Sequence, residues 1–307
     1  MHVLVIHNLI SGFGEGTIYD FIRNYIEDGD SITIRAFEGK TPFKTLLADA
    51  QDYDFVVACG GDGTIASVSY ELRNTKIPIL PFPAGTANLL ALNLLTPNEP
   101  HALCKIADEA LTLEFDLGEI ETDDKRLGFT LMAGCGYDEL IMRHASKNKR
   151  LLGPMAYFEA AFSNPTPQVS DLTLTIDGQE IKSSGIGVLA TNFSKIQFDL
   201  MVSEDNLPRD GLLDVVILKT KTALELIPTL FAKAVDHSGE LAKKIGSLEV
   251  YRGREVRIEA DPPMLMEYDG EATTISTPFT ARCLPEAARF IVSDECIRHF
   301  EERGSES

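Results

Sequence analysis

Apolar runs alternate with amphipathic segments through the first third of the chain. Residues 2–7 and 54–59 are short, mainly apolar runs of the kind that form buried strands. Residues 18–26 and 65–72 instead place apolar side chains at every third or fourth position, which is the spacing of one face of a helix. Strands that alternate with helices predict a Rossmann-like parallel sheet with helices on both faces. Such sheets bind ligands in the loops at the carboxyl ends of their strands.

The pattern changes near residue 112, where extended segments joined by tight turns begin. Residues 169–176 alternate between apolar and polar side chains and lead into Asp177-Gly178, and residues 264–268 lead into Asp269-Gly270. Both dipeptides are typical of two-residue hairpin turns. The second part of the chain is therefore predicted to be β-rich and β-sandwich-like.

These patterns divide the 307 residues into two predicted domains. We expect a nucleotide-binding α/β domain over residues 1–117, completed by residues 285–307, and a β-rich substrate domain over residues 118–284. Helical insertions are expected in the second domain near residues 155–163 and 222–242.

Charge and composition exclude several classes of function. Lys and Arg number 28 against 47 Asp and Glu, which gives a formal net charge of −19, whereas a duplex nucleic-acid partner requires a basic surface. The five cysteines are scattered and lack the paired spacing of zinc or redox motifs, which favours a reducing compartment. Prolines and asparagines interrupt the longest uncharged stretch, residues 77–98, so it predicts a strand, a loop and a helix rather than a membrane span. No secretory signal is evident, and we expect a cytoplasmic protein with no nucleic-acid partner.

The clearest chemical motif is Gly60-Gly61-Asp62-Gly63-Thr64, directly after a predicted buried strand and before a predicted helix. Glycines at such a place let the backbone approach a polyphosphate, and the following helix offers free amides and the positive end of its dipole. Asp62 is placed to hold Mg²⁺ or to orient the transferred phosphate. The alternative is a tight turn closed by the Asp62 side chain.

Two further loops are expected beside this motif. Residues 83–88 follow the next predicted strand, and there Thr86 and Asn88 could contact nucleotide or cap the following helix. Asn8, Ser11 and Gly12 belong to a glycine-containing loop after the first strand, whose spacing alone is weak evidence.

Two acidic turns are the remaining candidates in the second half. Asp269 and Glu271 would lie at a hairpin tip, where a carboxylate could accept a proton from a hydroxyl group, although hairpin turns favour Asp-Gly in any case. Asp210-Gly211 is similarly open to two interpretations, a turn or an oxygen-rich cation loop.

Taken in order, the three loops and Asp269-Gly270-Glu271 resemble the diacylglycerol kinase-like lipid kinase family, which includes bacterial diacylglycerol and phosphatidylglycerol kinases and sphingosine kinases. The match spans nearly the whole chain, with further similar segments at residues 127–138, 150–157 and 209–215. The Gly-Gly-Asp-Gly string is shared with NAD kinases and phosphofructokinases, and the distal motifs favour the lipid branch.

The resemblance implies an ATP- and Mg²⁺-dependent kinase with an α/β domain of the NAD kinase and diacylglycerol kinase type. It implies Glu271 as the general base, assisted by Asp62, and a structural Mg²⁺ held by Asp210 with backbone oxygens near Leu207 and Leu212. It places ATP on Asn8, Ser11, Gly12, Gly60, Gly61, Asp62, Gly63, Thr64, Thr86 and Asn88.

The expected reaction is phosphorylation of a lipid hydroxyl, with diacylglycerol as the default acceptor, by a protein that touches the inner face of the membrane transiently. A homodimer is compatible with this assignment. Basic residues between Arg143 and Arg150 could contact anionic headgroups or form a solvated helix end. Ala66, Ser67 and Leu89 stand where relatives usually carry polar groups, which keeps a non-catalytic nucleotide- or lipid-binding regulator as an alternative. The other alternative is a kinase of a soluble substrate such as NAD.

Overall fold

The computed structural model describes residues 1–11, 17–26, 30–137, 167–193, 206–222 and 248–306. Gly12, the expected helical insertions and the basic segment 143–150 lie outside these residues, apart from Thr222. The chain forms two compact units, one of residues Met1–Leu117 with Pro285–Ser307 and one of residues Gly118–Leu284.

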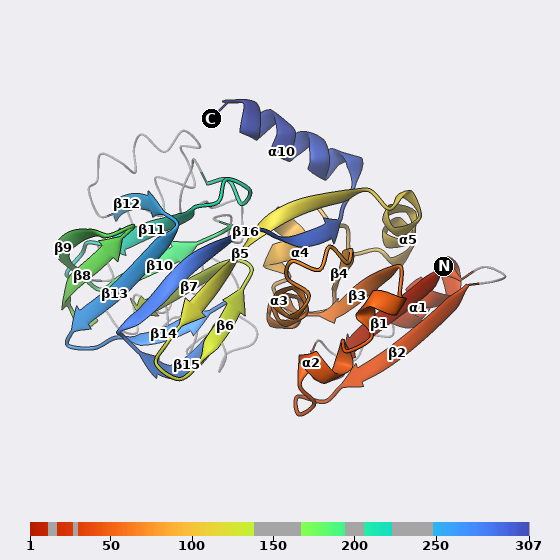
Figure 1. Ribbon diagram of the computed structural model, residues 1–307, viewed down its shortest axis with the longest axis horizontal. Helices are drawn as coiled ribbons and strands as arrows, with labels where there is room; N and C mark the ends of the chain where they lie inside the picture. Colours follow the sequence, from red (N-terminus) through yellow and green to blue (C-terminus); the bar gives the residue numbers. More distant parts are fainter. Residues whose placement is uncertain (12–16, 27–29, 138–166, 194–205, 223–247, 307) are drawn as a thin grey trace. The chain divides into compact units, whose positions relative to one another are not determined.

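The first unit contains four parallel strands in the order β2-β1-β3-β4 (Figure 1). The strands are β1 (His2–Asn8), β2 (Ser31–Phe37), β3 (Phe55–Gly60) and β4 (Ile79–Pro83). The helices are α1 (Thr17–Tyr25), α2 (Phe43–Leu46), α3 (Asp62–Glu71), α4 (Leu89–Asn93), α5 (Pro100–Glu109) and α10 (Asp294–Glu306), with a 3₁₀ turn at Ala50–Asp52.

Both faces of this parallel sheet are covered. Val3, Val5 and Val57 pack with residues of α1 and α5 in one apolar cluster. The alternate positions Leu4 and Val56, whose side chains point to the opposite face, are also fully buried. Burial on both faces is the reason that these strands read as continuous apolar runs, and the predicted α/β class is confirmed.

The second unit is antiparallel. One sheet has the order β12-β11-β10-β7-β14-β15, and in the other β13 pairs with β16 and β8, while β9 forms the edge beside β8. The chain passes between the units within β5 and within β16. The strands are β5 (Thr112–Glu121), β6 (Arg126–Phe129), β7 (Met132–Gly136), β8 (Ser170–Ile176), β9 (Gln179–Gly185), β10 (Gly187–Thr191), β11 (Leu213–Leu218), β12 (Leu248–Gly253), β13 (Glu255–Asp261), β14 (Leu265–Tyr268), β15 (Glu271–Ser276) and β16 (Phe279–Ile291).

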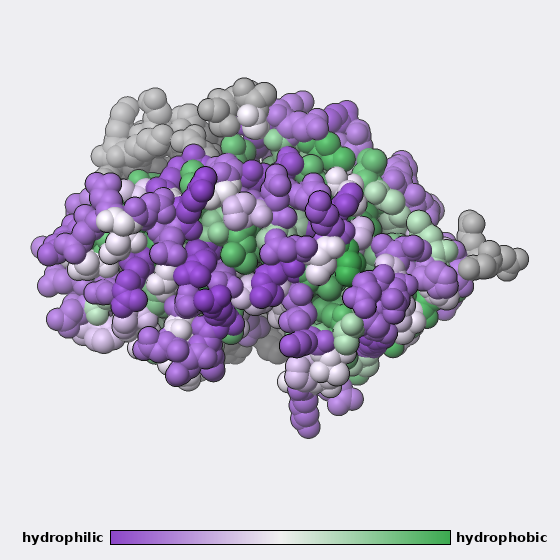
Figure 2. Space-filling model, viewed as in Figure 1, coloured by the Kyte–Doolittle hydropathy of each residue, from purple (hydrophilic) through white to green (hydrophobic). Residues whose placement is uncertain are grey.

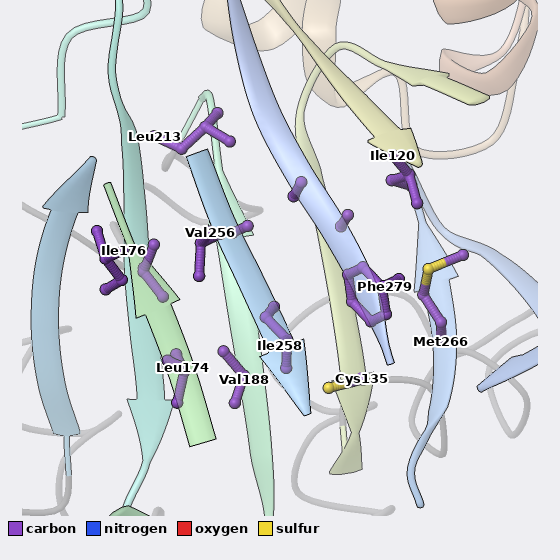
Figure 3. Close-up of a cluster of buried hydrophobic side chains, with 14 of the residues drawn as sticks. Ile120, Cys135, Leu174, Ile176, Val188, Leu213, Val256, Ile258, Met266 and Phe279 are labelled. Carbon is purple, nitrogen blue, oxygen red and sulfur yellow. The ribbon is translucent and has the colours of Figure 1, made fainter. Parts of the chain in front are cut away.

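The core of this unit is formed by side chains from both sheets. Figure 3 shows Leu174, Ile258 and Phe279 of one sheet in the same cluster as Val188 and Met266 of the other. The side chains between them along β8 and β13 are more exposed, and Figure 2 shows polar residues over the outer face of these strands. This alternation between buried and exposed positions confirms the predicted sandwich-like packing.

Both predicted two-residue turns are present. Asp177-Gly178 joins β8 to β9 and Asp269-Gly270 joins β14 to β15, with positive φ at all four residues. Positive φ at both central positions is the geometry that favours Asp-Gly in hairpins. None of the described helices has the length and apolar character needed to cross a membrane.

Candidate functional site

The three predicted loops of the first unit meet at the carboxyl ends of β1, β3 and β4. The Asn8 side-chain amide donates a hydrogen bond of 2.7 Å to the Thr64 hydroxyl. The Ala84 backbone amide donates to the Gly60 carbonyl oxygen at 2.9 Å, and the Ser11 hydroxyl donates to the Ala84 carbonyl oxygen at 3.4 Å. The structure therefore brings together residues that lie more than 70 positions apart in the sequence.

Two glycines allow the central and third loops to touch. A Cβ atom placed on Gly85 would lie 2.4 Å from the Gly61 Cα, a distance that side-chain-bearing residues do not tolerate. A Cβ atom on Gly60 would lie 2.5 Å from the Thr64 hydroxyl. Gly61 immediately precedes α3, so its partly buried backbone lies at the positive end of a ten-residue helix. The arrangement fits an anionic phosphate group.

Asp62 links the same two loops through its carboxylate. Its Oδ1 accepts a hydrogen bond of 2.8 Å from the Leu90 amide at the start of α4. Burial raises the pKa of Asp62, and hydrogen bonds from the backbone amides of Leu90, Leu89 and Asn88 oppose that rise. The carboxylate thus fixes the loop from residue 83 to residue 88 against the glycine motif. The backbone amides that bind Asp62 could not be predicted from the sequence, because no residue near Asp62 in the chain identifies them.

Asn88 and Thr86 differ in their surroundings. Asn88 adopts a left-handed conformation with φ of 51°, and its side chain accepts from the Gly85 amide at 2.8 Å and donates to the Gly85 carbonyl oxygen at 3.1 Å. It makes no side-chain capping bond to α4, so it shapes its own loop instead. Thr86 is exposed beside it. At the unusual position Ser67, the hydroxyl donates to the Gly63 carbonyl oxygen at 2.8 Å, within α3.

On the hairpin of the second unit, Asp269 is a structural residue. Its buried carboxylate accepts four hydrogen bonds, from the Thr130 amide and hydroxyl at 2.7 and 3.0 Å and from the amides of Leu131 and Met132 at 2.8 and 3.1 Å. These bonds fasten the β14–β15 turn to the chain that enters β7. Asp269 therefore positions the hairpin on which Glu271 stands.

Glu271, the predicted base, is exposed and lines a pocket of about 650 Å³. Other lining residues are Tyr268 and Thr273 from the same hairpin, and Lys125 and Leu127 from the turn and strand that follow β5. The pKa of Tyr268 is raised by burial and by the neighbouring Glu271 and Asp269 carboxylates. Sequence reasoning missed Lys125, because its approach to the hairpin depends on strand pairings that no local pattern shows.

An arginine of β12, Arg252, contacts the loop that is predicted to hold a structural Mg²⁺. The Asp210 amide donates to the Leu207 carbonyl oxygen at 3.3 Å, and the Asp210 carboxylate accepts from the Leu212 amide at 2.9 Å. The guanidinium of Arg252 binds the other Asp210 oxygen and donates to Asp214 Oδ1 at 2.9 Å. Within the described residues no group of three His, Cys, Asp or Glu side chains is arranged to hold a metal. The positive charge between the Asp210 and Asp214 carboxylates is that of Arg252. The Mg²⁺ ligand set of Asp210 with backbone oxygens near Leu207 and Leu212 stays a prediction, because such groups of side chains do not include backbone oxygens.

Two family models together cover almost the whole chain. The diacylglycerol kinase catalytic domain matches residues 2–120, and the YegS C-terminal NAD kinase beta sandwich-like domain matches residues 132–292. The chain belongs to the diacylglycerol kinase-like lipid kinase family. The resemblance seen in the sequence is thereby confirmed.

Individual relatives and fold neighbours show how far the similarity extends. An uncharacterised protein of Synechocystis sp. is 26% identical over 78% of this chain, which spans only 55% of that relative's length. A diacylglycerol kinase of Staphylococcus haemolyticus is 25% identical over 76% of this chain and 71% of its own. In fold, a diacylglycerol kinase structure from Bacillus anthracis gives a TM-score of 0.74 at 18% identity, covering 96% of this chain and 98% of its own. An NAD kinase from Archaeoglobus fulgidus in complex with ATP gives 0.55 at 15% identity, covering all of both chains.

Proposed function

We propose that the protein is an ATP- and Mg²⁺-dependent kinase that phosphorylates a lipid hydroxyl group, with diacylglycerol as the acceptor. The observation that carries this proposal is the close approach of Gly61 and Gly85 at the start of α3, where neither residue has a side chain that would keep a polyphosphate from the backbone. The family assignment, the name of the Staphylococcus haemolyticus relative and the ATP bound by the NAD kinase fold neighbour support it.

Each loop has a distinct part in nucleotide binding. The backbone amides around Gly61 and Gly63 bind the phosphates. The side chains on either side of this loop hold it in place or extend the binding surface; they are those of Asn8, Ser11, Thr64 and Thr86. Asp62 holds the loop of residues 83–88 beside these phosphate-binding amides. Mg²⁺ bound to the ATP phosphates would neutralise charge on the transferred group.

Glu271, an exposed carboxylate on the β14–β15 hairpin, is the general base in this proposal. Its carboxylate accepts the proton of the lipid hydroxyl while that oxygen forms a bond to the γ-phosphorus, and the bond from the γ-phosphorus to the ADP oxygen breaks. The products are a phosphorylated lipid and ADP. Such a protein would act at the inner face of the membrane, where its acceptor is found.

The proposal is tested by transfer of labelled γ-phosphate from ATP-Mg²⁺ to a panel of hydroxyl-bearing lipids in mixed micelles, with NAD in a micelle-free reaction. Label in diacylglycerol is the expected result. Label in NAD alone would assign the protein to soluble-substrate kinases. ATP binding without any labelled product would instead favour the non-catalytic regulator that Ala66, Ser67 and Leu89 left open.

A further inference from the structure

Two opposite charges, Lys125 and Glu271, line the same pocket. Among the residues that the structure describes, no carboxylate pairs with the Lys125 ammonium and no cation pairs with the Glu271 carboxylate, whereas Arg126 and Arg282 of the same unit are paired. The two groups do not pair with each other either. A ligand in this pocket can therefore meet a hydrogen-bond donor at Lys125 and an acceptor at Glu271.

This pair of groups sets a requirement on the ligand. It needs a hydroxyl to donate to Glu271 and, a few atoms away, an oxygen to accept from Lys125. An acylated glycerol has both, since its free hydroxyl and an ester oxygen are bonded to adjacent glycerol carbons, and the ester carbonyl is bonded to that ester oxygen. Leu127, Ala272 and Ile275 supply apolar lining for the start of an acyl chain.

The charges near the pocket decide whether the oxygen that accepts from Lys125 belongs to a neutral ester or to an anionic phosphodiester. Among the described residues that line the pocket, the charged side chains are Lys125 and Glu271, whose charges cancel. A neutral ester adds no charge to this balance. A phosphodiester would add a negative charge that no second lining cation offsets, in a chain whose net charge is already −19.

The geometry points to Lys125 as an acceptor-binding residue whose ammonium donates a hydrogen bond to an ester carbonyl oxygen of a neutral lipid, while the lipid hydroxyl faces Glu271. This assignment rests on the proposed function and narrows it to uncharged, ester-bearing acceptors.

The test compares Lys125→Met with the wild type on two short-chain lipids, dioctanoylglycerol and dioctylglycerol, the second having ether links and no carbonyl. Lys125→Met should raise KM for the ester about tenfold, the scale of one charge-assisted hydrogen bond near solvent, and leave kcat and the ether's KM within about twofold. Lys125→Arg, which keeps a cationic donor, should restore most of the ester affinity. Lys182→Met is the matched control, an exposed lysine on β9 that does not line the pocket.

Each other outcome overturns the assignment. Equal losses of affinity for the ester and the ether, or no loss for either, would show that Lys125 does not bind the ester carbonyl oxygen. A loss confined to an anionic glycerol phospholipid would show that the ammonium binds phosphate instead. If the wild type transfers phosphate to no lipid, the proposed function fails, and calorimetric affinities of the same four proteins for dioctanoylglycerol and dioctylglycerol decide the role of Lys125 separately.

Discussion

At the scale of single residues, the β14–β15 hairpin shows how two acids in one motif take different roles. Asp269 is buried and accepts four hydrogen bonds, whereas Glu271 is exposed beside an open pocket. A carboxylate that is already saturated with donors cannot accept a proton readily, because those bonds stabilise its charged form. This contrast supports the proposal that Glu271, and not Asp269, is the base.

Glu271→Gln should retain ATP binding and lower kcat by about 10²-fold or more, since the amide cannot accept the proton of the acceptor hydroxyl. Single-turnover phosphate transfer, with ATP affinity from calorimetry, checks this. Asp269→Asn is the contrasting variant, and it should lower the melting temperature because it weakens the bonds to Thr130 and Leu131. Unchanged kcat in Glu271→Gln would remove Glu271 from the chemistry.

The sequence could suggest Asp269 and Glu271 but could not separate them. The donors that saturate Asp269 come from residues 130–132, which are more than 130 positions away, so the turn and the catalytic interpretations of Asp269 were equally open from the residues alone, and only the family resemblance favoured Glu271 as the base. Asp62 was similarly recognised as a loop residue, while its partner amide at Leu90 was not. Long-range contacts of this kind leave no local signal.

At the scale of elements, the glycine contact between the loops after β3 and β4 makes a steric prediction. Gly85→Ala should weaken ATP binding about tenfold or more and destabilise the protein by about 1–3 kcal/mol, because the new methyl group would lie 2.4 Å from the Gly61 Cα and force the loops apart. ATP titration and chemical denaturation measure both effects.

Gly304→Ala is the matched control for that substitution. Nothing lies within 4 Å of a Cβ atom built on Gly304, which belongs to α10, so this alanine should leave ATP binding unchanged and stability equal or slightly higher. Normal ATP affinity in Gly85→Ala would mean that the close approach of the two loops is not needed for nucleotide binding.

The Asp210 loop before β11 supports a second element-scale prediction. Arg252→Met should lower the free energy of unfolding by about 1–3 kcal/mol, because it leaves the buried Asp214 carboxylate without its partner. Arg257→Met is the control, since its pair with Glu259 is about half exposed on both sides and should contribute about 1 kcal/mol at most.

Metal dependence distinguishes the arginine from a structural cation. Chelation of Mg²⁺ should leave the melting temperature of the nucleotide-free wild type unchanged, whereas millimolar Mg²⁺ should stabilise Arg252→Met by occupying the space between Asp210 and Asp214. A large stability loss when the wild type is chelated would show that Mg²⁺ binds this loop despite Arg252.

Sequence periodicity predicted most elements but not their pairing. The apolar runs identified β1 and β3, and Asp-Gly dipeptides identified two hairpins, because these signals lie within a few residues. β14 lies between β7 and β15, and its pairing with β7 joins segments that are more than 100 residues apart in the sequence. The pocket at Glu271 is built from such pairings, which is why Lys125 was not predicted.

At the scale of the whole molecule, the response to alkaline pH follows from groups buried in both units. Burial raises the pKa of Tyr25 and of Cys59 in the first unit to about 12, and it raises the pKa of Tyr137 in the second unit to about 12. In the unfolded chain these groups lose their protons near pH 9 to 10. The folded state therefore holds more protons than the unfolded state between about pH 9 and 12, and stability must fall as pH rises through that window.

Melting temperature should accordingly be nearly constant from pH 7 to 9 and decline steadily toward pH 12. Tyr25→Phe should make the decline shallower, because the phenylalanine keeps the stacking with Phe21 but has no proton to lose. Tyr19→Phe is the control, since Tyr19 is 50% exposed and should leave the slope unchanged. If Tyr25→Phe and the wild type decline in parallel, the alkaline sensitivity arises elsewhere: from Cys59 and Tyr137, or from repulsion among the 47 acidic residues, which grows as lysines lose their protons and which salt would screen. Repeating the series at high ionic strength separates the two causes, because screening weakens surface repulsion but leaves the desolvation of a buried phenol in place.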